Sequence, residues 1–170
     1  AVGSALGAIA VLMLALFALE MVLRTIGAGY EPTFFVKGEN SYLHANRNFG
    51  RLFFPESTLR EGFAGRIKDR KAEDTFRIFL LGESAIMGFP APRFGPARIL
   101  ECMIRESFPG KKYEVVNAAV AGISSHGVLR VAQEIKQLEP DALIVYMGNN
   151  EVVGPYGPGS IVTKNVVPLW

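Results

Sequence analysis

The sequence predicts an α/β fold in which helices cover a parallel sheet, preceded by a transmembrane helix. Two observations predict it. Three apolar segments, at residues 76–81, 113–119 and 142–147, alternate with two amphipathic segments at the spacing of right-handed crossover connections. In addition, residues 1–19 are apolar apart from glycines and Ser4, and none of them is charged.

Composition restricts the class of protein further. A chain of 170 residues is typical of about one domain, and a hydrophobic share of 49% excludes disorder. The single cysteine, Cys102, excludes an internal disulfide and a zinc site made of cysteines alone. Two histidines, His44 and His126, leave little room for a metal centre, and we expect neither a metal nor a cofactor. A net charge of +2 predicts no nucleic-acid partner.

The first apolar run is long enough to cross a bilayer. As a helix, residues 1–19 would extend about 28 Å, close to the hydrocarbon core of about 30 Å. A signal peptide cleaved near residues 26–29 is the main alternative, although its apolar core is usually only about 7–15 residues long. A buried soluble helix would show a polar stripe. We therefore expect a single-pass membrane anchor at 1–26, and because the sequence starts with Ala1 we expect further residues before it.

Residues 27–74 are rich in aromatic side chains and lack a regular period. A flexible linker would be rich in Gly and Ser or in Pro. The aromatic content instead predicts an extended arm packed on a neighbouring surface, with a short strand or hairpin. The charged run at 68–74 is interpreted as a solvated lead-in to the folded domain.

The regular elements begin after Thr75. The run at 76–81, interrupted only by Arg77, predicts a buried parallel strand. Residues 98–108 predict a helix, whose apolar face comprises Ile99, Leu100, Met103, Ile104 and Phe108. A second strand is predicted at 113–119, followed by a helix capped by Ser124 or Ser125. The apolar face of that helix comprises Val128, Leu129, Ala132, Ile135 and Leu138, and the third strand is predicted at 142–147.

Each predicted strand ends in residues that suit acyl-transfer chemistry. In an open α/β sheet, ligands bind outside the carboxyl ends of the strands, where Ser84, Gly122 and Asn150 lie. Ser84 could act as a nucleophile on a strand-to-helix turn. The N–H groups of Ser84 and Gly122 and the side-chain amide of Asn150 could stabilise an oxyanion.

These three segments together resemble the first blocks of the SGNH (GDSL-type) hydrolases. The segments are Gly82-Glu83-Ser84, the lone Gly122 and Gly148-Asn149-Asn150-Glu151, where the family has Gly-Asp-Ser, Gly and Gly-x-Asn-Asp. The resemblance implies Ser84 as the nucleophile and Gly122 and Asn150 as oxyanion donors. It also implies a three-layer flavodoxin-like sheet and a small-molecule or carbohydrate ester as substrate.

The membrane-anchored bacterial members of this family are the most similar, and they are often joined to tetratricopeptide repeats. The resemblance therefore implies an extracytoplasmic (periplasmic) hydrolase domain with a possible repeat region downstream. The family's Asp-x-x-His motif, which supplies the base, does not occur in this sequence. We expect residues 75–170 to be the truncated N-terminal part of the hydrolase domain, inactive alone.

Several alternatives remain open for these residues. Ser84, Gly122 and Asn150 could be ordinary turn residues, and the segment from Gly82 to Gly88 could bind a phosphate or nucleotide. His126 could be a surface histidine, a substrate contact or the base.

The other polar residues near these segments also have two interpretations each. Glu83 and Glu151 could form a carboxylate pair for glycoside chemistry, but hydrogen bonds that hold the loops are favoured. Asn117 is interpreted as the end of its strand, rather than as a residue that orients the following loop. A non-catalytic membrane-bound scaffold is the alternative for the whole chain.

Overall fold

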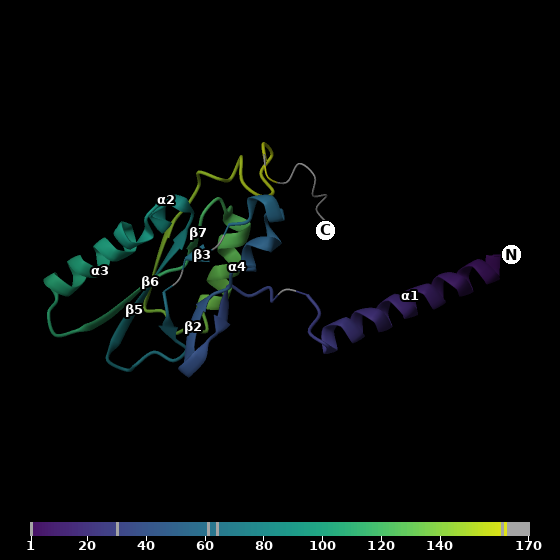
Figure 1. Cartoon of the computed structure of the whole chain (residues 1–170), viewed down its shortest axis with the longest axis horizontal. Helices are drawn as coiled ribbons and strands as arrows, with labels where there is room; N and C mark the ends of the chain where they lie inside the picture. Colours follow the sequence, from purple (N-terminus) through teal and green to yellow (C-terminus); the bar gives the residue numbers. More distant parts are fainter. Residues whose placement is uncertain (1, 30, 61, 64, 161, 163–170) are drawn as a thin grey trace. The chain divides into compact units, whose positions relative to one another are not determined.

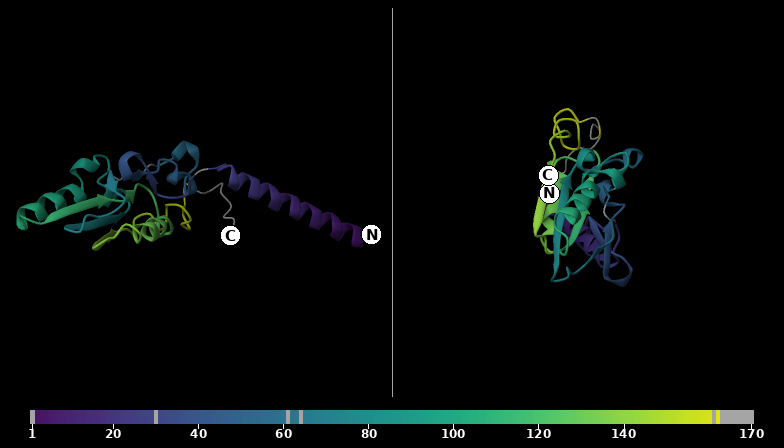
Figure 2. Two further views of the ribbon diagram at one scale, coloured as in Figure 1. Left: turned by 90° about the horizontal axis from the view of Figure 1, so that it is seen from below. Right: turned by 90° about the vertical axis from the view of Figure 1, so that its left-hand side faces the viewer.

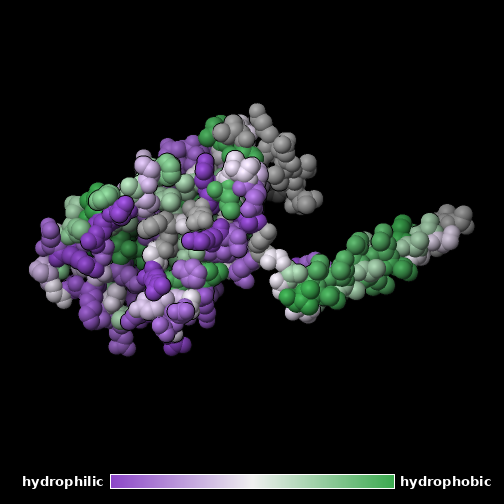
Figure 3. All heavy atoms as spheres, in the orientation of Figure 1, coloured by the Kyte–Doolittle hydropathy of each residue, from purple (hydrophilic) through white to green (hydrophobic). Residues whose placement is uncertain are grey.

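The computed structural model describes residues 2–29, 31–60, 62–63, 65–160 and 162, and the chain divides into two compact units, Ala1–Glu31 and Pro32–Trp170. The first unit contains one helix, α1 (Val2–Thr25). Its segment Ser4–Thr25 is long and apolar enough to cross a membrane, and none of it is buried within the protein. Apolar side chains cover the surface of this helix (Figure 3). A signal sequence would satisfy the same criterion, so the anchor and its orientation stay predictions.

The second unit contains a parallel sheet with helices on both faces. Its strands are β1 (Phe35–Lys37), β2 (Tyr42–Ala45), β3 (Gly62–Phe63), β4 (Ile67–Lys68), β5 (Thr75–Gly82), β6 (Lys112–Asn117), β7 (Ala119–Val120) and β8 (Ala142–Tyr146). Its α-helices are α2 (Ser84–Met87), α3 (Pro96–Ser107) and α4 (Ser125–Ile135). Short 3₁₀ segments lie at Glu39–Ser41, Phe49–Leu52, Glu56–Thr58 and Pro92–Phe94.

The main sheet has the order β6-β5-β8, and both strand pairs are parallel. This confirms the three parallel strands predicted from the apolar runs. On one face, Ile78 and Leu80 of β5 pack with residues of α2 and α3. On the other face, Phe79 and Leu81 pack with residues of α4. The helices therefore lie on opposite sides of the sheet (Figures 1 and 2).

The aromatic arm is packed into the same compact unit from Pro32 onward. It forms the predicted hairpin, β1 with β2, which β4 extends to a three-stranded antiparallel sheet. Its rings are buried in one cluster with Phe79 of β5 and with α4: Phe34, Phe35, Phe49, Phe53 and Phe54. The ring centroids of Phe34 and Phe49 are 5.2 Å apart in an edge-to-face arrangement. The arm thus supplies much of the core on the α4 side of the sheet.

The predicted second strand is divided in two. β6 ends at Asn117, and the N–H of Ala118 donates to Leu80 O at 2.8 Å. β7 then pairs antiparallel with β3 of the arm instead of continuing along β5. The prediction of one strand over 113–119 was therefore wrong at its end, because the apolar pattern does not show which partner a strand pairs with.

The predicted helix faces were correct only in part. On α3, Ala97 is buried and Leu100 and Ile104 are partly buried, whereas Ile99 and Met103 are exposed, as is Phe108 directly after the helix. On α4, Val128, Val131 and Ile135 are buried and Leu129 is exposed. Both helices carry more apolar residues than can face the sheet at once. The apolar pattern therefore does not determine which side of each helix packs against the sheet.

The outer strand β8 is apolar but exposed on both faces. Leu143 and Val145 are 47% and 54% exposed on one face, and Ile144 and Tyr146 are 38% and 56% exposed on the other. Parallel strands are normally covered on both sides. The side chains of β8 stay exposed because α3 and α4 cover β5 and no described strand pairs with the outer edge of β8.

One buried cation ties several elements together at the amino end of β5. Arg77 is 1% exposed, and its Nε donates to Glu114 at 2.6 Å. Its Nη1 and Nη2 donate to the carbonyl oxygens of Leu138 and Lys68 at 2.7 and 2.9 Å. Its backbone N–H donates to Asp141 at 2.7 Å. Arg77 thus joins β5 to β6, to β4 and to the segment between α4 and β8.

Asp141 should make the stability of the folded unit dependent on pH. Lys71 Nζ hydrogen bonds to this carboxylate at 2.7 Å, and together with the Arg77 N–H it lowers the pKa of Asp141 below 3.8. Its contribution to stability is present above the unfolded-state pKa and is lost as the pH falls through the lowered folded-state pKa. As the pH falls below the unfolded-state pKa of this carboxyl, Asp141→Asn should therefore lose less stability than the unchanged chain.

Hydrogen exchange of the β5 amides measures this effect in detergent. Glu73→Gln, at a neighbouring position with no described partner, is the matched control and should follow the unchanged chain. Identical acid sensitivity of the unchanged chain and Asp141→Asn would contradict the assignment.

Candidate functional site

The three predicted strand breaks lie at one edge of the sheet. Leu80 pairs with Asn117 and Gly82 pairs with Tyr146, so the three strands end at nearly the same level. Gly82 has a φ of +144°, and a Cβ there would overlap with the carbonyl oxygen of Tyr146. Glycine therefore lets the ends of β5 and β8 approach closely.

Ser84 is the first residue of α2 and lies directly after this contact. It is partly exposed, and its hydroxyl has no hydrogen-bond partner among the described residues. Its carbonyl oxygen accepts from the N–H groups of Gly88 and Phe89 at 3.1 and 3.0 Å, which closes the single turn of α2. The backbone of Ser84 is thus held in place while its hydroxyl remains free for another partner.

Glu83 connects the residue before Ser84 to the loop after β8. Its side chain is fully buried, and Oε1 accepts from the N–H groups of Gly148 at 2.9 Å and Asn150 at 3.3 Å. Its Oε2 and Asn150 Nδ2 are both buried and have no hydrogen-bond partner among the residues that the structure describes. The Ser84 and Asn150 segments are therefore tied together by one carboxylate.

Replacing Glu83 with alanine should loosen this edge of the sheet. The N–H groups of Gly148 and Asn150 would lose their acceptor, and each buried donor left unpaired costs about 1–3 kcal/mol. We expect a loss of about 2–4 kcal/mol in the free energy of unfolding, measured by chemical denaturation in detergent. Glu106→Ala on exposed α3 should change it by less than about 0.5 kcal/mol. Equal losses in the two variants would contradict the role assigned to Glu83.

Gly122 lies between β7 and α4, close to the Asn150 loop. It has a φ of +76°, the left-handed conformation that favours glycine. A Cβ on Gly154 would lie 2.5 Å from Asn150 O and 3.1 Å from Gly122 O, so these three backbones meet. The structure thus places the loops that carry Ser84, Gly122 and Asn150 together at one edge.

A second glutamate holds the start of α4. Glu151 accepts from the N–H and from the hydroxyl of Ser125, both at 2.8 Å. Its negative charge also suits a helix N-terminus. Ser124 occupies the N-cap position, but its hydroxyl donates to Pro155 O at 2.9 Å and makes no cap hydrogen bond. Ser124 therefore occupies the predicted N-cap position but does not make the cap hydrogen bond, so this part of the prediction was wrong. The favoured role of Glu83 and Glu151, which was to hold the loops by hydrogen bonds, is confirmed.

Asn117 does more than end its strand. Its Nδ2 donates to Met87 O at 2.9 Å, and its Oδ1 accepts from Ala119 N at 3.3 Å. Asn117 thus links the end of α2 to the start of β7 and is 4% exposed. The sequence analysis favoured a strand end without a further role. The only signal for the linking role of Asn117 was its amide side chain directly before a run of small residues.

The two histidines lie outside any catalytic arrangement of the described residues. His126 is the second residue of α4, is exposed and contacts the ring of Tyr156 at 5.4 Å between centroids. His44 lies on β2 in the antiparallel sheet. Neither has a described hydrogen bond to Ser84 or to a carboxylate. In the part of the chain that the structure describes, no group of three His, Cys, Asp or Glu side chains could hold a metal.

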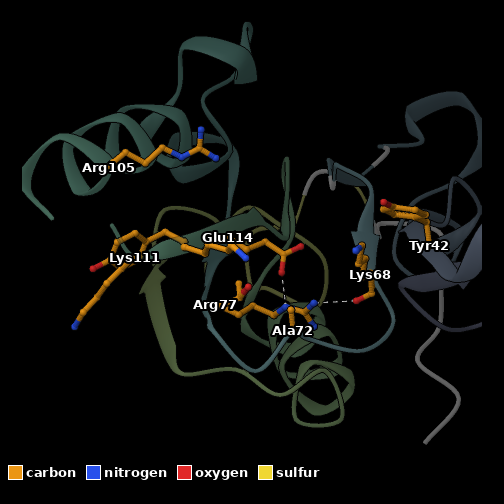
Figure 4. A pocket seen from close by; sticks show the side chains of 10 residues that line it. Tyr42, Lys68, Ala72, Arg77, Arg105, Lys111 and Glu114 are labelled. Atoms are coloured by element: carbon orange, nitrogen blue, oxygen red, sulfur yellow. Dashed lines mark hydrogen bonds and ion pairs between the residues drawn. The ribbon is translucent and has the colours of Figure 1, made fainter. Parts of the chain in front are cut away.

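One hollow lies away from this edge, beside the amino ends of β5 and β6. It has a volume of about 590 Å³ and is lined by basic side chains, among them Lys68, Arg105 and Lys111 (Figure 4). Arg77 and Glu114, which form an ion pair, also line it. None of the predicted site residues lines this hollow.

Two further residues from the arm lie next to Gly122. A Cβ on this glycine would lie 3.5 Å from the ring of Phe54 and 4.0 Å from Cγ of Arg60. Sequence reasoning missed both, because neither belongs to a motif and both are more than 60 positions away from Gly122 along the chain.

Comparison with known proteins found no family model, no curated relative and no solved structure that matches this chain.

Proposed function

We propose that this chain is part of an ester hydrolase or acyltransferase of the SGNH type, with Ser84 as its nucleophile. The observation that carries the proposal is the link made by the Glu83 side chain. It joins the segment of Ser84, whose hydroxyl has no described partner, to the segment of Asn150, whose side-chain amide also has none. An unpaired buried donor is costly for a protein, and a substrate oxygen would satisfy it. The strand order β6-β5-β8 also agrees with the first three strands of the flavodoxin-like order 2-1-3-4-5.

The proposed reaction proceeds through an acyl-enzyme. Ser84 Oγ attacks the carbonyl carbon of the ester while its proton moves to a histidine base. The carbonyl oxygen becomes an oxyanion, which accepts hydrogen bonds from the N–H groups of Ser84 and Gly122 and from the Asn150 amide. The tetrahedral intermediate then breaks its ester C–O bond, and the leaving alcohol takes the proton from the base. Water or an acceptor hydroxyl releases the acyl group by the same steps in reverse.

The base is proposed to lie outside the described residues, as the Asp-x-x-His motif of the family implies. The exposed position of His126 and its contact with Tyr156 agree better with a surface role. The phosphate-binding alternative receives little support, because α2 has only four residues and four residues form a weak helix dipole. We further propose that α1 anchors the domain at the outer side of a membrane as a single pass.

Covalent labelling tests the proposal. The product of the whole reading frame should react with a fluorophosphonate probe, and mass spectrometry should find the adduct on Ser84. Ser84→Ala should abolish the adduct, whereas Ser107→Ala at the exposed end of α3 should not. Residues 1–170 alone should react little if the base lies outside this sequence, as proposed. An adduct on another serine, or none in the whole product, would overturn the proposal and favour a binding role.

A further inference from the structure

Arg60 is a cation beside the glycine that the proposed function assigns to the oxyanion hole. Its Cγ lies 4.0 Å from the point that a Cβ on Gly122 would occupy. The ring of Phe54, from the same arm, lies 3.5 Å from that point. The arm therefore supplies one wall beside Gly122, made of an apolar ring and a charged side chain.

The backbone of Arg60 is held on both sides. Its carbonyl oxygen lies so close to Gly50 that a Cβ on that glycine would overlap with it. Two residues further on, β3 pairs with β7, so that Gly62 lies opposite Val120 and Phe63 opposite Ala119. Since β7 ends two residues before Gly122, this pairing fixes the distance between Arg60 and Gly122. The backbone that carries the Arg60 side chain is therefore held in place before any ligand arrives.

The guanidinium of Arg60 has no partner among the described residues, and the residue is exposed. Arg51 of the same arm differs, because it pairs with Glu56 at 2.7 Å. Among the described residues of this edge, Glu83 accepts hydrogen bonds from Gly148 and Asn150, and Glu151 accepts one from Ser125. The Arg60 side chain therefore carries a positive charge that is unpaired among the described residues, and its Cγ lies next to the glycine of the proposed oxyanion hole.

We propose that Arg60 binds an anionic group of the ester substrate and so selects acidic esters over neutral ones. This inference rests on the proposed function. A guanidinium donates two parallel hydrogen bonds to a carboxylate, sulfate or phosphate, which a lysine ammonium cannot reproduce. The flexible arginine side chain begins 4.0 Å from the Gly122 position, so its head group can contact a substituent next to the reacting carbonyl. Phe54 offers an apolar surface for the uncharged part of the same substrate.

Kinetics with matched esters test this role on the product of the whole reading frame. The neutral substrate is 4-nitrophenyl acetate, and 4-nitrophenyl hemisuccinate carries the charge on the acyl group. In the second pair, O-acetyl glucuronate carries the charge on the alcohol part of the ester, and O-acetyl glucose is its neutral counterpart. For the acidic ester of either pair, Arg60→Gln should raise KM about 10- to 100-fold with little change in kcat, because a hydrogen-bonded charge pair is lost. KM for the neutral esters should change less than about twofold.

Two further variants separate recognition from structure. Arg60→Lys should keep part of the preference, since it retains the charge but not the paired geometry. Arg51→Gln, in the same arm, should leave the preference unchanged. Higher salt should reduce the preference of the unchanged enzyme and should have no such effect on Arg60→Gln.

The possible failures are distinguishable. If Ser84 is labelled but Arg60→Gln leaves both acidic esters unaffected, the inference on Arg60 is wrong and the proposed function stands. An equal rise of KM for acidic and neutral esters would show a structural role and would also overturn the inference. If Ser84 is not labelled and no ester is hydrolysed, both the proposed function and this inference fail.

Discussion

Ser84→Ala should lower kcat for ester hydrolysis by about 10⁴-fold or more, as expected when a catalytic nucleophile is removed. The substitution removes only a hydroxyl without a described partner, so the fold should remain intact. Esterase assays on the product of the whole reading frame measure the rate, and hydrogen exchange of β5 verifies folding. Ser107→Ala, a surface serine at the end of α3, is the matched control.

A second substitution, at Asn150, makes this test more specific. Asn150→Ala should lower kcat by about 10²–10³-fold through the loss of one oxyanion donor. When Ser84 is already alanine, the same substitution at Asn150 should have little further effect, because residues that act on one transition state are not additive. Independent effects of the two substitutions would argue against a shared oxyanion. Activity retained in Ser84→Ala would exclude the serine mechanism.

Arg77→Met should destabilise the folded unit by about 3–5 kcal/mol, the usual cost of removing one partner from a buried ion pair. Arg77 is 1% exposed, and its side chain donates to Glu114 and to two carbonyl oxygens, those of Leu138 and Lys68. Methionine fills a similar volume but leaves all three acceptors without their donor. Total stabilities of domains are about 5–15 kcal/mol, so this one substitution approaches the limit of folding.

Two variants decide whether charge or geometry matters at this position. Arg77→Lys keeps a positive charge but cannot donate in three fixed directions, so we expect it to lose more than half as much stability as Arg77→Met. Arg98→Met is the control, because Arg98 pairs with Glu101 at 2.8 Å while its side chain is 55% exposed. Exposed pairs contribute about 0–1 kcal/mol. Chemical denaturation in detergent measures these differences, and a loss below 1 kcal/mol for Arg77→Met would contradict the assigned role.

The sequence analysis identified some residues of the candidate site and missed others. Ser84, Gly122 and Asn150 could be singled out because each follows an apolar run, and in parallel sheets such ends meet at one edge. The structure brings their loops to that edge, and their chemical roles remain predictions. Arg60 and Phe54 had no signal, since the arm reaches Gly122 through an antiparallel pairing of β3 with β7 that no local pattern shows.

The sequence by itself therefore determined the number and type of the main elements, the apolar α1 and the three strand ends. These features depend on local periodicity and on residues that interrupt it, which can be recognised within a short window. Only the tertiary structure decided which helix faces are buried, where the second strand ends, that Arg77 lies at the centre of a hydrogen-bonded network, and that the aromatic arm borders the site. These depend on contacts between segments far apart along the chain, and their energies are set by the geometry of packing and of paired polar groups, which the composition of any single segment does not contain.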